Sequence, residues 1–157
     1  MTITIDVDDP AWNDIPGLEG LVHGAVCAAL AAAGADEAAH ETAILLTDDD
    51  TVAQLNADWR GKTGPTNVLS FPAASDLPLP PGEAAPLGDI ALAAGVIARE
   101  ARDQGKTLPQ HTTHLIIHGV LHLLGYDHED EAEAREMEGL ETEILKGLGI
   151  SDPYERQ

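Results

Sequence analysis

Four short segments of the chain predict four β-strands, and apolar and polar residues alternate in the first of them. The segments are TITIDV, HETAILLT, NVLSF and LGDIALA, at residues 2–7, 40–47, 67–71 and 87–93. Side chains of a strand point alternately to its two faces, so this period of two is typical of half-buried strands. Residues 72–86, between the last two strands, contain five of the ten prolines, and we expect a loop there.

Elsewhere apolar residues recur every three or four positions, which predicts five α-helices. Two of them have clear start signals: Thr47 and the acids after it precede one helix, and Thr107 with Gln110 forms a capping box before another. The expected helices span about residues 17–33, 48–59, 93–104, 108–124 and 130–146. This order of elements indicates an α/β or α+β fold with helices packed on one mixed sheet. The length fits one domain over residues 1–157.

Acidic residues dominate the charge of the chain. It has 28 acidic residues against three lysines and five arginines, a net charge of −20. A protein that holds nucleic acid by neutralising many phosphates should be basic. Any contact with RNA would therefore be local, assisted by a metal, or helped by a partner. Because the acids are scattered, we interpret them as a solvating surface rather than as an acidic docking surface.

The sequence predicts a cytoplasmic protein. The first ten residues, MTITIDVDDP, lack the basic start and apolar core of a signal peptide, and no run of about 18 apolar residues occurs. Cys27 is the one cysteine, so no disulfide forms within the chain.

Four histidines fall within fifteen residues of the segment HLIIHGVLHLLGYDHED, residues 114–130. His118 and His122 are four positions apart, which places them about 40° apart on one face of a helix. Two imidazoles one turn apart can bind one ion at Zn–N distances of about 2.0–2.1 Å. A lone histidine on an apolar face is usually a core or surface residue, but the combined pattern H-x3-H-x2-G-x2-H indicates a metal site.

Spacing favours His128 over His114 as the third ligand. His114 lies two turns from His122, so their α-carbons are roughly 12 Å apart, too far to share one small ion comfortably. Gly125 can take a left-handed conformation, end the helix and let the chain return toward the histidine pair. We therefore predict one Zn²⁺ per chain on His118, His122 and His128, with an open catalytic position. His114 would help to position a metal-binding histidine or would contact the substrate.

Gly119 distinguishes this motif from that of zinc peptidases. In the peptidases with the same spacing, the residue after the first histidine is the glutamate that acts as general base. A glycine cannot take that role, so the base comes from elsewhere or the substrate supplies its own nucleophile.

The segment HGVLHLLGYDH resembles the signature of the bacterial YbeY family, metal-dependent endoribonucleases and ribosomal RNA maturation factors. LNADWRGKTGPTNVLSFP and LGDIALA resemble two further segments of that family, and the order of elements agrees over roughly residues 40–146. Asn67 stands where the family more usually has aspartate. The resemblance implies an α+β fold, a mixed sheet and zinc on the three histidines.

The resemblance also implies that Arg60 is the functional arginine of a cleft. Arg60 and Lys62 form the densest positive spot of the chain, and phosphate recognition favours the two-pronged guanidinium. Arg60 and His114 are the candidate catalytic residues. Asp127 could orient a histidine or cap a turn, and Ser70 and Asp89 could line the cleft or be structural.

The resulting hypothesis is a zinc-dependent, single-strand-specific endoribonuclease for small-subunit ribosomal RNA 3′-end processing and ribosome quality control. The nucleophile would be water or the 2′-hydroxyl of the RNA. Expected partners are ribosomal RNA, the small ribosomal subunit, and a ribosomal protein or assembly GTPase, with neither a membrane nor DNA involved. The alternatives are a ribosome-assembly binding protein with a mainly structural zinc and, less favoured, a metallopeptidase.

Overall fold

Four strands form one mixed sheet in the computed structural model, which describes residues 2–35, 40–73, 85–126 and 130–150. The strands are β1 (Thr2–Val7), β2 (His40–Thr47), β3 (Val68–Pro72) and β4 (Ala85–Ala93), in the order β1-β2-β4-β3. Neighbours β1, β2 and β4 are parallel, whereas β3 pairs antiparallel with β4 and forms an edge of the sheet.

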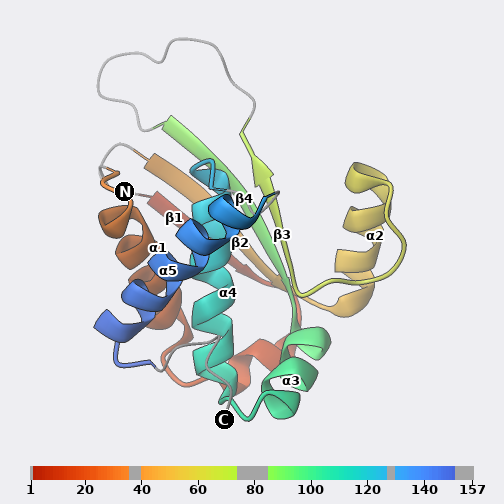
Figure 1. Ribbon diagram of the computed structural model, residues 1–157. Coiled ribbons are helices and arrows are strands. Elements are labelled where there is room, and N and C mark those ends of the chain that lie inside the picture. Colours follow the sequence, from red (N-terminus) through yellow and green to blue (C-terminus); the bar gives the residue numbers. More distant parts are fainter. Residues whose placement is uncertain (1, 36–39, 74–84, 127–129, 151–157) are drawn as a thin grey trace.

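The helices flank this sheet unequally. The described residues form α1 (Leu18–Ala32), α2 (Asp49–Arg60), α3 (Ala94–Asp103), α4 (Leu108–Leu123), α5 (Glu131–Gly147) and a short 3-10 helix, η1 (Pro10–Asp14). Helices α1, α4 and α5 lie together on one side of the sheet, and α2 lies apart from them beyond β3 (Figure 1). The predicted α+β fold, with a four-stranded mixed sheet and five α-helices, is confirmed.

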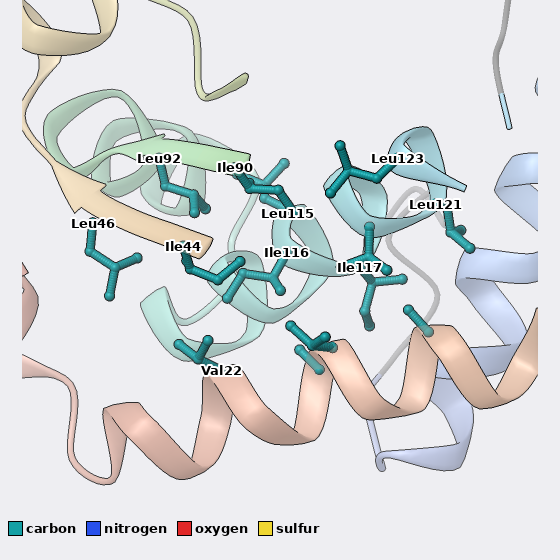
Figure 2. Close-up of a cluster of buried hydrophobic side chains, with 14 of the residues drawn as sticks. Val22, Ile44, Leu46, Ile90, Leu92, Leu115, Ile116, Ile117, Leu121 and Leu123 are labelled. Carbon is teal, nitrogen blue, oxygen red and sulfur yellow. The ribbon is translucent and has the colours of Figure 1, made fainter. Parts of the chain in front are cut away.

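The main core lies between the sheet and the helices α1 and α4. Alternate residues of β2 and β4, such as Ile44 and Ile90, point toward Ile116 of α4 and Val22 of α1 (Figure 2). Burial of these side chains is the main favourable contribution to folding. Because α4 packs on both the sheet and α1, its backbone and the side chains it carries are held firmly in place.

Strand β3 separates α2 from α4. Leu69 of β3 packs with Val52 of α2 and Ala93 of β4 in a second, smaller core. The next residue, Ser70, points to the opposite face, where its hydroxyl donates a hydrogen bond to the carbonyl of Gly119 at 3.1 Å. The sheet edge at β3 therefore has α2 on one face and α4 on the other.

Local signals account for the helix ends that were predicted. The hydroxyl of Thr107 accepts from the backbone N–H of Gln110, and the Gln110 side chain accepts from the Thr107 N–H, a complete capping box. The cap of α2 is Asp48 rather than Thr47, because its carboxylate accepts from the N–H of Thr51 at 2.7 Å. None of the helices in the described parts of the chain is both long and apolar enough to cross a membrane.

Candidate functional site

Helix α4 carries the two histidines of the predicted metal site to the edge of the core. His118 and His122 are partly exposed, whereas nearly all of their neighbours on the helix are buried. Their Nε2 atoms lie 3.0 Å apart, and the two rings are nearly perpendicular, at 80°. Two nitrogens on one tetrahedral zinc ion would be roughly 3.3 Å apart, given Zn–N bonds of about 2.05 Å. The pair therefore fits a shared ion in chemistry and in spacing.

The sequence analysis missed Glu141 of α5, a buried carboxylate behind the histidine pair. Glu141 is 0% exposed, and its Oε1 lies 2.5 Å from Nδ1 of His118. A histidine that donates its Nδ1 proton to a carboxylate keeps the Nε2 lone pair free for a metal, and the carboxylate also fixes the ring orientation. Glu141 thus holds His118 in the tautomer and orientation that a metal ligand needs.

One signal in the sequence could have identified Glu141. Helix α5 contains six glutamates, in the sequence EAEAREMEGLETEILKG, and most of them are exposed. Glu141 follows Met137 by four positions and precedes Leu145 by four, and both of these residues are buried. It is therefore the acid on the apolar face of the helix, where a carboxylate is expected only with hydrogen-bond partners.

His114 faces the same carboxylate rather than the open side of α4. Its Nε2 lies 3.1 Å from Oε2 of Glu141, and the residue is 9% exposed. The His114 and His118 rings are 6.4 Å apart between centroids. Of the two roles predicted for His114, this position fits support of a ligand better than contact with substrate.

Gly119 allows α4 to pack closely against the sheet. A Cβ atom at this position would lie 3.1 Å from two carbons of Ile90 and 3.2 Å from the hydroxyl oxygen of Ser70. These distances are tighter than ordinary van der Waals contact, so a larger residue would push β3 and β4 away. Close packing against β3 and β4 therefore explains why position 119 holds a glycine and not the glutamate of the peptidase motif.

A cleft of about 780 Å³ brings the histidine pair together with Arg60. Arg60 and Trp59, at the end of α2, form part of its wall, and strand β3 contributes Ser70 and its neighbours. The complete lining is Trp59, Arg60, Thr66, Asn67, Val68, Ser70, Phe71, Pro72, His118, His122, Gly125 and Tyr126. The edge strand β3 thus lies between Arg60 at the end of α2 and the histidines of α4.

The end of α2 is fixed by its cap. Gly61 adopts a left-handed conformation with φ of 64°, which ends the helix directly after Arg60. The Lys62 N–H donates to the carbonyl of Asn56, and the Asn56 side chain donates to the carbonyl of Gly64. Lys62 is exposed and does not line the cleft.

Asn67 lines the cleft and belongs to a polar cluster at its wall. Its amide donates to Oε1 of Glu100 at 3.0 Å, and Nε2 of the buried His111 lies 3.0 Å from the same oxygen. Burial lowers the pKa of His111, and the nearby Glu100 only partly opposes this effect. An amide suits position 67, because a carboxylate there would repel that of Glu100.

Besides Lys62, three of the predicted site residues lie elsewhere or cannot be placed. Asp89 is exposed and lines two other cavities beside β2 and β4, not the cleft that contains the histidines. Asp127 and His128 fall outside the described residues, so His128 remains a predicted ligand. Within the described ranges, no group of three His, Cys, Asp or Glu side chains is arranged to hold a metal.

Comparisons with known proteins agree with this architecture. Residues 9–149 match the family model described as Endoribonuclease YbeY. The Endoribonuclease YbeY of Paramagnetospirillum magneticum is 51% identical over 164 residues, covering 100% of both chains. That of Dinoroseobacter shibae is 50% identical and covers 98% of this chain and 91% of its own. The solution structure of TM1509 from Thermotoga maritima aligns with a TM-score of 0.56 at 25% identity, over 99% of this chain and 100% of its own. The chain therefore belongs to the Endoribonuclease YbeY family.

Proposed function

We propose that this chain is a zinc-dependent endoribonuclease that cleaves single-stranded RNA. Family membership supports the activity on RNA. The single structural observation that carries the proposal is the cleft that His118, His122 and Arg60 line together. It combines a pair of metal-binding nitrogens with a guanidinium, the side chain best suited to bind phosphate.

His118, His122 and the predicted third ligand His128 would hold the zinc ion. A bound zinc ion supplies a Lewis acid for a phosphoryl oxygen and lowers the pKa of water to about 7. Glu141 fixes the His118 ring from behind through the Nδ1–Oε1 hydrogen bond. The role of the chain is therefore to keep three neutral imidazoles pointed at one position beside the substrate.

Arg60 would bind the phosphate that is cleaved. Its guanidinium can donate two parallel hydrogen bonds to the non-bridging oxygens, where negative charge accumulates in the transition state. The nucleophile is either water or the 2′-hydroxyl of the RNA, and the second route explains why no glutamate is needed at Gly119. The close packing of Gly119 on Ile90 disfavours the peptidase alternative, because it leaves no room for that base.

The proposed biological role is maturation of the 3′ end of small-subunit ribosomal RNA and ribosome quality control in the cytoplasm. Its partners would be ribosomal RNA, the small ribosomal subunit, and a ribosomal protein or assembly GTPase. The net charge of −20 supports a role for such partners, because the chain cannot hold long RNA by broad phosphate neutralisation.

Metal content, thermal melting and RNA cleavage of the same preparations test the proposal. We expect one zinc per chain and cleavage of a single-stranded oligonucleotide in the wild type. His122→Ala should lose zinc and cleavage but keep the fold, because His122 is partly exposed. Freshly purified wild type without metal would refute the ligand set. Collapse of the fold on loss of metal would favour the assembly-factor alternative.

A further inference from the structure

Most of the aromatic side chains in the described parts of the chain line the cleft. The chain has only five aromatic residues other than histidine. Trp12 lies in the core at 1% exposure, and its indole N–H donates to the carbonyl of Thr47. Each of the three other aromatics within the described residues, Trp59, Phe71 and Tyr126, lines the cleft that contains the histidine pair.

Trp59 differs from the other two because it has no part in the core. Phe71 packs against the small core beside α2, and Tyr126 packs against the main core. Trp59 belongs to neither cluster and is 73% exposed. A single exposed apolar side chain is common on protein surfaces, so exposure alone does not indicate function. The position of Trp59 beside Arg60 on the wall of the cleft is what indicates a function.

The charge of the protein favours an uncharged source of RNA affinity. Most proteins gain affinity for nucleic acid by releasing counterions from many phosphates, which requires many basic residues. This chain has eight basic residues against 28 acidic ones. Stacking of bases on aromatic rings is the principal uncharged interaction available with single-stranded RNA, and every base has a face that can stack.

We propose that the cleft selects single-stranded RNA by stacking an unpaired base on the indole of Trp59. Arg60, the next residue, would then bind a nearby phosphate, while Phe71 and Tyr126 supply apolar surface to neighbouring bases. Bases inside a duplex are already stacked on both faces, so they cannot use this surface. The inference rests on the proposed function and assigns the preference for single strands to a particular side chain.

Fluorescence anisotropy of a dye-labelled 2′-O-methyl hexaadenylate measures binding by the wild type and every variant, and tryptophan emission adds a second readout in the wild type. Because Trp12 is buried, quenching by an oligonucleotide in the cleft would report on Trp59. Trp59→Ala should weaken binding by about 5- to 150-fold, the range expected for the loss of one stacked base. Trp59→Phe should keep most of the affinity, because it retains an aromatic face.

Two controls separate stacking from other effects. Leu148→Ala removes another exposed apolar side chain, 43% exposed at the end of α5, and should leave binding unchanged. An abasic oligomer of the same length and charge should bind wild type and Trp59→Ala equally. Unchanged hexaadenylate binding by Trp59→Ala would overturn the proposal. So would an equal loss of affinity for the abasic oligomer, which would indicate a contact with the backbone.

Cleavage assays distinguish this proposal from the proposed function. If an unpaired base stacks on Trp59, Trp59→Ala should raise the KM for single-stranded RNA far more than it lowers kcat. Wild-type cleavage combined with an unchanged KM in Trp59→Ala would refute stacking and leave the nuclease function intact. A zinc-loaded wild type that neither binds nor cleaves RNA would refute both.

Discussion

Glu141 on α5 and His118 on α4 are joined by a hydrogen bond of 2.5 Å between Oε1 and Nδ1, across 23 residues of sequence. Glu141 is completely buried, and a buried carboxylate destabilises a protein unless its oxygens are hydrogen-bonded. His118 and His114 satisfy one oxygen each. The stability of α5 packing and the orientation of a metal ligand therefore depend on the same side chain.

Glu141→Gln should weaken zinc binding by about 10- to 100-fold, the usual effect of losing a carboxylate behind a ligating histidine. The amide is similar in shape but carries no charge and can also donate, so it no longer fixes the Nδ1–H tautomer of His118. A competition titration with a chelating dye measures the affinity, and thermal melting shows whether the fold is kept. Glu143→Gln removes the same charge from an exposed position of α5 and is the matched control. Equal zinc affinity in the two variants would contradict this role of Glu141.

Arg60→Ala should lower kcat for RNA cleavage by about 10²- to 10³-fold, as expected when a donor to the transition state is lost. Stability should change little, because Arg60 is exposed at the end of α2. Arg60→Lys should restore only a small part of the rate, since an ammonium lacks the two-pronged geometry. Single-turnover kinetics check the result, with Lys62→Ala as the control because Lys62 lies outside the cleft lining. An equal loss in both variants would indicate general electrostatic attraction instead.

The parts of the site that the sequence predicted are those that depend on local spacing. The pairing of His118 with His122 follows from one helical turn, and the start of α4 follows from the Thr107 capping box. Glu141 could not be recognised with the same certainty, because its partners come from another helix and its own helix is rich in glutamate. The position of Asp89 also depended on tertiary structure, since the sheet register directs it away from the histidine cleft.

Gly119→Glu should destabilise the protein by about 2–5 kcal/mol, through overpacking and burial of an unpaired charge. The new side chain would begin within 3.1 Å of Ile90. Gly119→Ala is the graded control: its methyl group meets the same atoms, but alanine favours the helix by up to about 1 kcal/mol, so the net change should be small. Chemical denaturation measures the change in the free energy of unfolding of both variants. A folded Gly119→Glu variant of wild-type stability, with new peptidase activity, would contradict the packing explanation.

His111 should make the stability of the fold depend on pH below about 6.5. Burial lowers the pKa of His111 in the folded protein, while the unfolded chain keeps the ordinary value of about 6.5. As pH falls through 6.5, the unfolded chain binds a proton first, so stability is full above this pH and decreases below it. The free energy of unfolding falls by at most about 1.4 kcal/mol per pH unit, and this fall ends near the pKa of His111 in the folded protein.

His111→Gln measures this contribution. The amide nitrogen of glutamine can still donate to Glu100, so the hydrogen bond is kept while the titrating group is removed. Glu100, His114 and Lys106 also affect the pKa of His111, but they are unchanged in the variant. Denaturation of the metal-free proteins between pH 5 and pH 8 should therefore show a shallower loss of stability in His111→Gln. Parallel curves for the two proteins would mean that His111 titrates alike in the folded and unfolded states, contrary to its burial at 3% exposure.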